Sequence, residues 1–257
     1  MLILLSPAKS LDFETPSGTS AFSQPVLLEQ SRKLMARLRK LSPAEIGTLM
    51  GISDRLAVLN AERFAAWKPP FSPSNAKQAM LAFNGDVYDG LAARTFGEGD
   101  LEYAQSHLRI LSGLYGVLRP LDLIQAYRLE MSIKLPTPGH KDLYEFWGER
   151  LTKTLNEAAR DISAEAVVNL ASEEYFRAVR ADKLAVPPIQ PVFEDWSGGK
   201  YKVLGLFAKR ARGKMARFAI TRRLEEALGL REFSEDGYAF VAEASDDLRW
   251  VFRRRSK

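Results

Sequence analysis

The chain of 257 residues contains no cysteine and only two histidines, His107 and His140. Without cysteine, the protein cannot have a disulfide framework, a zinc–thiolate site, an iron–sulfur cluster or a cysteine nucleophile. The two histidines lie far apart in the sequence, and neither stands in a spacing typical of metal ligands. We therefore expect no metal site made by the protein and no other cofactor.

Long apolar runs are also absent, so we expect no membrane-spanning segment and no membrane partner. The N-terminal MLILL is far shorter than the apolar part of a signal peptide and leads directly into Ser6-Pro7. We predict that this segment forms a buried β-strand and that the protein is cytoplasmic.

Helical and strand patterns are interleaved along the whole chain, without a linker, an internal repeat or a break in composition. This organisation predicts an α+β fold, a single compact domain over residues 1–257 in which helices surround a mixed β-sheet. Two closely packed lobes are the alternative. Helices are expected over 27–40 and 141–160 and after Ser42-Pro43 and Ser72-Pro73. Strands are expected over 127–135, 166–170 and 201–207, with a hairpin over 238–242 and 248–254.

Basic residues are concentrated in one short segment. Residues 209–223 read KRARGKMARFAITRR, with seven basic residues and no acidic one. Outside this segment the chain carries 30 of its 37 Lys and Arg residues against 32 Asp and Glu residues. A second small basic patch closes the chain, at Arg253, Arg254, Arg255 and Lys257. Concentrated positive charge is typical of a surface that binds a polyanion, and nucleic acid is the first candidate.

The basic segment has the pattern of an amphipathic helix. Ala211, Met215, Phe218 and Ala219 fall on one side at 100° per residue, so we expect that side to be buried and the cations to face outward. A solvated surface helix, a membrane-surface helix or a helix that binds an acidic protein would have the same pattern. The cations expected to bind DNA phosphates are Lys209, Arg210, Arg212, Lys214 and Arg217.

The sequence around residue 51 has the residue pattern of a helix-hairpin-helix element. Gly51, Ile52 and Ser53 would join two helices, and Arg55 would follow in the first turn of the second one. In such an element the backbone N–H groups at the start of the second helix point at a DNA phosphate. Ser53 stands where a second glycine is usual, so an ordinary turn with Ser53 as helix N-cap is the alternative.

Polar residues follow two predicted strands at their carboxyl ends, where α/β proteins place ligands. They are Ser6, Lys9, Asn169, Ser172 and Glu173. Ser6 and Lys9 could hold a phosphate or a base beside Glu173 in a nucleotide-processing pocket. Their spacing also occurs in penicillin-binding proteins, but the chain has neither a Lys-Thr-Gly nor a Ser-Asp-Asn motif. Capping of the next helix and a surface ion pair are the structural alternative.

Two arginines lie in or beside the apolar run over residues 108–124. Arg119 and Arg128 are costly there unless they are paired or bind a ligand, so we interpret them as salt-bridged structure or as anion ligands. Gly113 and Gly116 in the same run could form a further hairpin, or a buried strand and turn.

Several blocks of the sequence together resemble the YaaA peroxide stress resistance family. They are MLILLSPAKSLDF, the Phe83-x-Gly85-x-Val87-Tyr88 block, LSGLYGVLRPLDLIQAYRLEM over 111–131, NLASEEYF over 169–176, and AKRARGKMARF. Asn84 and Ala126 depart from the family pattern, in which Lys and Pro would be expected. The blocks span nearly the whole chain in the expected order.

The resemblance implies a bacterial cytosolic protein of the hydrogen peroxide response whose members limit oxidative DNA damage. It also implies DNA binding, an unusual α+β fold with a positively charged cleft, and a helix-hairpin-helix motif. Double-stranded or structured DNA is then the expected partner, and DNA repair proteins are candidate partners. Our leading hypothesis is a DNA-binding protein with little or no catalytic activity and low sequence specificity, and we assign no catalytic residue. The alternative is an enzyme that processes a nucleotide or a damaged base in the strand-end pocket.

Overall fold

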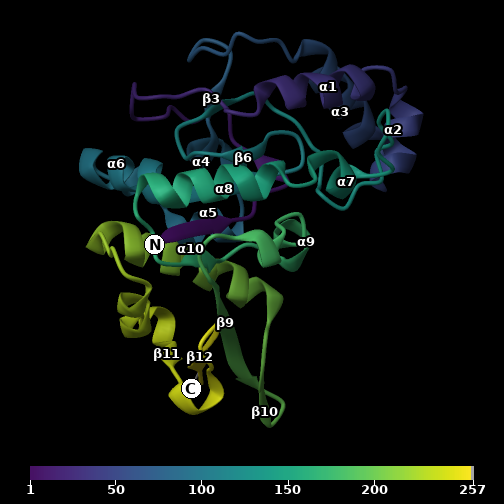
Figure 1. Ribbon diagram of the computed structural model, residues 1–257. Coiled ribbons are helices and arrows are strands. Elements are labelled where there is room, and N and C mark those ends of the chain that lie inside the picture. The colour runs from purple at the N-terminus through teal and green to yellow at the C-terminus, as the bar shows by residue number, and fades with distance from the viewer. Residues whose placement is uncertain (256–257) are drawn as a thin grey trace.

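The computed structural model describes residues 1–255, and its centre is a mixed sheet of eight strands (Figure 1). The strand order is β11-β12-β9-β8-β1-β5-β6, with β10 paired to β9. β1 is parallel to β5 and β8, and β9 is parallel to β8 and β12. The strands are β1 (Leu2–Leu5), β5 (Leu108–Ser112), β6 (Gly116–Leu118), β8 (Val167–Asn169), β9 (Pro188–Ser197), β10 (Lys200–Lys202), β11 (Ala239–Phe240) and β12 (Arg249–Arg254).

Helices lie around this sheet, so the predicted α+β fold with a mixed sheet is confirmed. Two small two-stranded sheets lie outside the central sheet. One pairs β2 (Ser10–Leu11) with β4 (Phe83–Asn84), and the other pairs β3 (Lys77–Gln78) with β7 (Leu123–Ile124). The helices are α1 (Leu28–Leu38), α2 (Pro43–Met50), α3 (Asp54–Ala66), α4 (Ala79–Ala82), α5 (Asp86–Leu91), α6 (Glu98–His107), α7 (Leu143–Trp147), α8 (Arg150–Asp161), α9 (Glu173–Phe176) and α10 (Gly205–Arg222).

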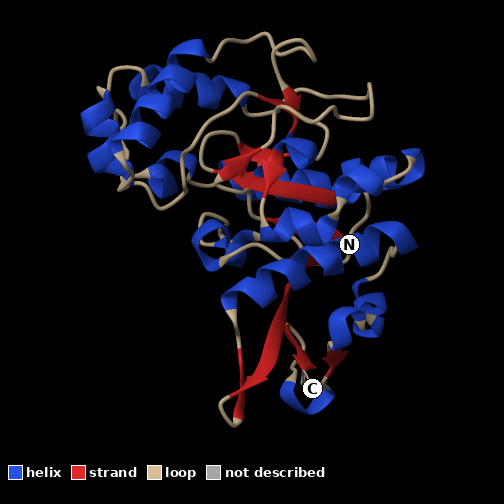
Figure 2. Cartoon of the chain, turned by 180° about the vertical axis from the view of Figure 1, so that it is seen from behind, coloured by secondary structure: helices blue, strands red, loops and turns tan. Residues whose placement is uncertain are grey.

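The long axis of the molecule is visible in both ribbon views. α1, α2 and α3 gather at one end, and β9, β10, β11 and β12 extend toward the other, where the chain ends (Figures 1 and 2). β1 and α10 lie between these two ends. The sheet therefore connects the first strand of the chain with the last one.

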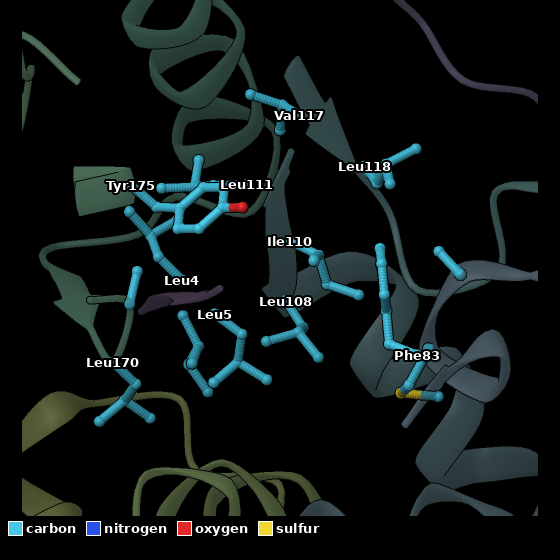
Figure 3. Packing of buried hydrophobic residues seen from close by; sticks show 14 of the residues in the cluster. Leu4, Leu5, Phe83, Leu108, Ile110, Leu111, Val117, Leu118, Leu170 and Tyr175 are labelled. Atoms are coloured by element: carbon cyan, nitrogen blue, oxygen red, sulfur yellow. The ribbon is translucent and has the colours of Figure 1, made fainter. Parts of the chain in front are cut away.

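The central strand β1 forms because its apolar run can be buried on both faces. All four of its residues are buried, and Ile3 faces Leu108 of β5 and Val168 of β8 in the register. A continuous apolar run is what a strand covered on both faces requires. In Figure 3, Leu4 lies beside Leu111 and Tyr175, and Leu5 lies toward Leu108 and Leu170. The predicted N-terminal strand and the strand expected over 166–170 are both confirmed.

Two predicted elements have bounds that differ from the predicted ones. Gly148, at a φ of +51°, ends α7 and separates it from α8, so the helix expected over 141–160 is two helices. β10 ends at Lys202 and α10 begins at Gly205, which places the end of the expected strand 201–207 inside the helix. The hairpin of β11 and β12 is confirmed.

The strand predicted over 127–135 is wrong. Tyr127, Leu129 and Met131 are buried as their alternation indicated, but no strand pairs with this segment. Its backbone instead crosses the Gly113 turn so closely that a Cβ at Gly113 would lie 2.2 Å from the Leu129 carbonyl oxygen. The alternation of apolar residues over 127–135 therefore indicated which side chains are buried, but it did not indicate strand pairing.

The two Ser-Pro signals have different outcomes. Ser42 caps α2 as predicted, with Glu45 completing a capping box in which each side chain bonds the other residue's backbone N–H. Ser72-Pro73 starts only a turn, because the Asn75 side chain accepts from the Ser72 N–H at 2.9 Å and the chain then enters β3. The helix expected there is therefore wrong.

Two glycines allow α10 to pack directly on α5. A Cβ at Gly213 would lie 1.8 Å from the Val87 carbonyl oxygen, and a Cβ at Gly90 would lie 2.2 Å from the Arg210 carbonyl oxygen. The two backbones touch at this crossing. It fixes the first half of α10 along the length of α5.

Candidate functional site

A cavity of 420 Å³ opens where β1 and β8 end and α5 meets α10. β1 and β8 are adjacent parallel strands, so their carboxyl ends reach the same edge of the sheet. The apolar part of the lining includes Leu170 and Tyr175, which lie beside β1 in Figure 3. The polar and charged side chains of the lining are Ser6, Lys9, Ser10, Asn84, Asp86, Tyr88, Glu130, Ser172, Glu174, Tyr175, Lys209 and Arg212.

The two strand ends are tied together by hydrogen bonds. The Ser172 N–H donates to Ser6 Oγ at 2.8 Å, and the Ser6 hydroxyl donates to Ser172 Oγ at 3.2 Å. The Tyr88 hydroxyl donates to the Ser6 carbonyl oxygen at 2.9 Å. The structure brings Ser6, Lys9 and Ser172 to one cavity, and the Ser6 hydroxyl is already used to hold the wall of that cavity.

Glu130 is the central carboxylate of the site. Only 8% of the residue is exposed, and its Oε1 lies 3.4 Å from Lys9 Nζ and 3.0 Å from Arg128 Nη2. Its second oxygen, Oε2, is buried without a hydrogen-bond partner among residues 1–255. Arg128 is therefore salt-bridged structure at the edge of the cavity. Glu130 is not among the pocket residues predicted from the sequence.

Arg212 brings a half-buried cation to the same cavity. Its Nε has no hydrogen-bond partner, and the guanidinium makes no ion pair within residues 1–255. Burial lowers the pKa of the Arg212 guanidinium, because a positive charge is less stable away from water when no carboxylate lies beside it. Lys209 lies three residues earlier on the same face of α10 and is exposed.

Two tyrosines line the cavity as neutral groups. Burial raises the pKa of both Tyr88 and Tyr175 well above the ordinary range. Their phenol groups therefore stay protonated at physiological pH. They add apolar ring surface to the cavity and no negative charge.

Four of the seven predicted pocket residues, Asn169, Glu173, Arg119 and Arg128, lie outside the cavity lining. Asn169 Nδ2 donates to Gln190 Oε1, and its Oδ1 accepts from the Ala171 N–H at 3.0 Å, so its amide organises the end of β8. Glu173 is exposed at the start of α9, and the next residue, Glu174, lines the cavity instead. No sequence pattern separated these two adjacent glutamates.

Arg119, the remaining pocket candidate, is also structural. Its Nε donates to Asp122 Oδ1 at 3.1 Å, and its Nη2 donates to the Gln24 carbonyl oxygen at 2.9 Å. Asp122 is fully buried and accepts from Ser23 as well. Arg119 therefore holds the loop around Ser23 against the apolar run, as the salt-bridged alternative predicted.

The basic helix has the predicted buried face, formed by Ala211, Met215, Phe218 and Ala219. Its five candidate cations divide into three groups, of which Arg212 in the cavity wall is the first, and this corrects the expectation that all of them face outward. Lys214 pairs with Asp236 and, at 3.9 Å, with Glu235. Arg217 donates to Thr95 Oγ1 at 2.7 Å and to two backbone carbonyl oxygens. Lys209 and Arg210 are exposed and make no ion pair within the described residues.

The C-terminal basic patch is largely engaged with the sheet. Arg253 Nε donates to Glu194 at 2.9 Å, and Arg254 Nε donates to Asp195 at 2.6 Å. The Arg255 guanidinium lies over the Trp196 ring, 4.7 Å from its centroid. Lys257 lies outside the described residues.

The turn at residues 51–53 joins α2 to α3, as predicted. Gly51 has a φ of +60°, and the N–H groups of Gly51 and Ile52 both donate to the Gly47 carbonyl oxygen. Ser53 is the N-cap of α3, but its side chain accepts no capping hydrogen bond, and Arg55 is exposed. Both ribbon views place α2 and α3 far from α10 (Figures 1 and 2). The use of this turn as a DNA-contacting helix-hairpin-helix element stays a prediction.

Two features are absent from residues 1–255. None of the helices found there has both the length and the apolar character that crossing a membrane requires. In the same residues, no group of three or more His, Cys, Asp or Glu side chains is arranged to hold a metal ion.

The fold and site define an α+β protein with a cavity at the ends of parallel strands and a basic helix in its wall. The chain belongs to the family described as peroxide stress protein YaaA, whose model matches residues 1–244. It is 58% identical over 255 residues to a UPF0246 protein of Dechloromonas aromatica, and the match covers 99% of each chain. It is also 57% identical over 256 residues to a UPF0246 protein of Ralstonia nicotianae, and this match covers 100% of each chain. The predicted family membership is thereby confirmed.

Proposed function

We propose that this protein binds DNA during peroxide stress by gripping the phosphate backbone with low sequence specificity. The observation that carries the proposal is the pair Lys209 and Arg210, two exposed cations of α10 without a carboxylate partner in the described chain. An exposed, unpaired cation can neutralise a phosphate without first giving up a protein contact. Phosphate contacts position a protein on DNA and carry no base information, so low specificity follows.

Lys214 and Arg217 are given a different role in this proposal. Each already has protein partners, and binding a phosphate would require breaking them. Arg212 faces the cavity and makes its charge available there. DNA contact along α10 is therefore assigned mainly to Lys209 and Arg210, with Arg212 at the cavity.

The turn between α2 and α3 is a second proposed contact. The first backbone N–H groups of α3 have no side-chain cap, and Arg55 stands exposed in the first turn. Such a helix start favours an anion. Asp54 in the same turn opposes a phosphate, so this contact contributes less than the α10 cations.

Binding to a labelled duplex across a salt series tests the proposal. Lys209→Gln/Arg210→Gln should lower the affinity and reduce the magnitude of the slope of log K against log salt by about 2, since about 0.9 is lost per phosphate contact. The matched control is Lys153→Gln/Arg160→Gln, which removes one Lys and one Arg charge from exposed positions on α8. Equal affinities and slopes for wild type and the α10 variant would contradict the proposal.

A second function, the processing of a nucleotide or a damaged base, is favoured by the cavity itself. Glu130 Oε2 and Arg212 Nε are buried, unpartnered polar atoms in its wall. Unpaired polar groups in a concave site are typical of ligand binding. This function needs the cavity, whereas duplex binding is assigned mainly to the exposed cations of α10.

Protection of cells against peroxide separates the two functions. If the cavity acts on a nucleotide, Lys9→Gln or Glu130→Gln should abolish protection and leave duplex affinity unchanged. Glu173→Gln is the matched control, because this glutamate lies outside the cavity lining. Full protection by both cavity variants would exclude the second function.

A further inference from the structure

The cavity wall contains two buried polar atoms without a hydrogen-bond partner, one on a cation and one on a carboxylate. Arg212 Nε and Glu130 Oε2 are both buried in its wall, and neither has a hydrogen-bond partner within residues 1–255. The two residues do not pair with each other, and Glu130 contacts Lys9 and Arg128 through its other oxygen only. A single ligand would satisfy both groups if it carried an anion at one end and a hydrogen-bond donor at the other.

The cationic side of the cavity suits a phosphate group. Arg212 and Lys209 are three residues apart on α10, so both can reach one anion from the same helix face. A guanidinium offers paired donors that match phosphate oxygens, and the nearby ammonium adds a second positive charge. The carboxylates of the lining, Asp86, Glu130 and Glu174, come from other elements.

The remaining lining suits a nucleobase. Tyr88 and Tyr175 contribute neutral aromatic rings, and bases bind aromatic rings without preference for sequence. Glu130 Oε2 can accept from a base N–H group, which every common nucleobase offers on its pairing edge. The volume of 420 Å³ lies within the range of about 300–1,000 Å³ usual for small-molecule sites.

We propose that the cavity binds a 5′-nucleoside monophosphate unit, with its phosphate on Arg212 and Lys209 and its base beside Glu130 and the two tyrosines. This inference rests on the second candidate function, and not on duplex binding. The unit has two chemically equivalent sources, a free mononucleotide and a nucleotide turned out of a DNA strand. Lys209 belongs both to the cavity and to the exposed face of α10, so either source can reach the site.

Calorimetric titration of the full chain with the four 2′-deoxynucleoside 5′-monophosphates tests the free source. At least one should bind about tenfold or more tightly than deoxyadenosine or deoxyribose 5-phosphate, because each of those lacks one half of the unit. Arg212→Gln should weaken this binding about tenfold or more, and Arg212→Lys should weaken it less. Glu173→Gln should bind like wild type. Lys209→Glu, at an exposed position, gives an independent test if Arg212→Gln fails to fold.

Labelled duplexes with and without one unpaired nucleotide test the DNA source. A preference of about tenfold for the unpaired nucleotide that disappears in Arg212→Gln supports the proposal with DNA as the source. Absence of both mononucleotide binding and this preference overturns it. So does full binding of the mononucleotide by Lys209→Glu and by a folded Arg212→Gln variant. Loss of duplex affinity in Lys209→Gln/Arg210→Gln is a separate result, so failure of one proposal leaves the other testable.

Discussion

Gly213 of α10 lies directly against the carbonyl oxygen of Val87 on α5. A Cβ at Gly213 would lie 1.8 Å from this oxygen and 2.8 Å from the Leu91 nitrogen, and both are backbone atoms that a side chain cannot displace. The close crossing holds Lys209 and Arg212 at the cavity. The glycine in the middle of the basic helix therefore positions the site, although glycine weakens a helix interior.

Gly213→Ala should lower the free energy of unfolding by at least about 2 kcal/mol, because the added methyl group must push the two backbones apart. Urea denaturation measures this change. The control is Gly205→Ala in the first turn of the same helix, where nothing lies within 4 Å of the added Cβ. It should change stability by less than about 1 kcal/mol. Equal effects of the two substitutions would show that the crossing is loose.

Arg217→Gln should lower the free energy of unfolding by about 1–3 kcal/mol, because it removes charged hydrogen bonds to Thr95 and to the carbonyl oxygens of Leu91 and Ala92. Duplex affinity should fall less than in the Lys209→Gln/Arg210→Gln variant. Thermal unfolding and the salt-series binding assay measure both quantities. A stable Arg217→Gln variant with strongly reduced affinity would show that this arginine binds DNA.

Ionised Asp12 should stabilise the folded protein, and this contribution should be lost at acidic pH. The Thr15 backbone N–H and the Arg94 side chain hold the pKa of the Asp12 carboxyl far below its usual range. Because this pKa is lowered in the folded state, the stabilisation is complete above the unfolded value of about 3.9 and is lost as the pH falls through lower values. Asp12→Asn should therefore be less stable than wild type at pH 7, with a gap that narrows below about pH 4. Asp247→Asn, at an exposed carboxylate that makes no ion pair among residues 1–255, is the control. A gap independent of pH would contradict this assignment.

Arg55→Gln should reduce the magnitude of the salt slope for duplex binding by about 1, as expected for the loss of one phosphate contact at the α2–α3 turn. Arg160→Gln on α8 removes the same charge from another exposed helix and should leave the slope unchanged. If both variants match wild type, the turn is only a connection between two helices.

The sequence predicted those parts of the fold that local pattern and burial determine. The run of β1 is apolar at every position, as a strand buried on both faces requires, and Ser42-Pro43 marked the start of α2. The apolar stripe of α10 was correct for the same reason. The segment 127–135 misled because its alternation arises from packing across the Gly113 turn rather than from strand pairing.

The site was only partly predictable, because its charges are assigned by partners from distant segments. Ser6, Lys9 and Ser172 were placed together from the rule that parallel strands end at one edge of the sheet. Nothing local indicated that Asp236 would engage Lys214, that Thr95 would engage Arg217, or that Arg212 would turn into a cavity. A basic run in a sequence therefore gives the amount of charge, and the fold decides how much of it is free.

Survival of hydrogen peroxide is the most direct test of the central claim, that exposed cations of α10 connect DNA binding with peroxide resistance. Bacteria lacking their own copy would receive wild type, Lys209→Gln/Arg210→Gln, or the control Lys153→Gln/Arg160→Gln at equal protein levels. We expect the control to protect like wild type and the α10 variant to protect little better than no protein. Full protection by an α10 variant that no longer binds duplex DNA would contradict the claim.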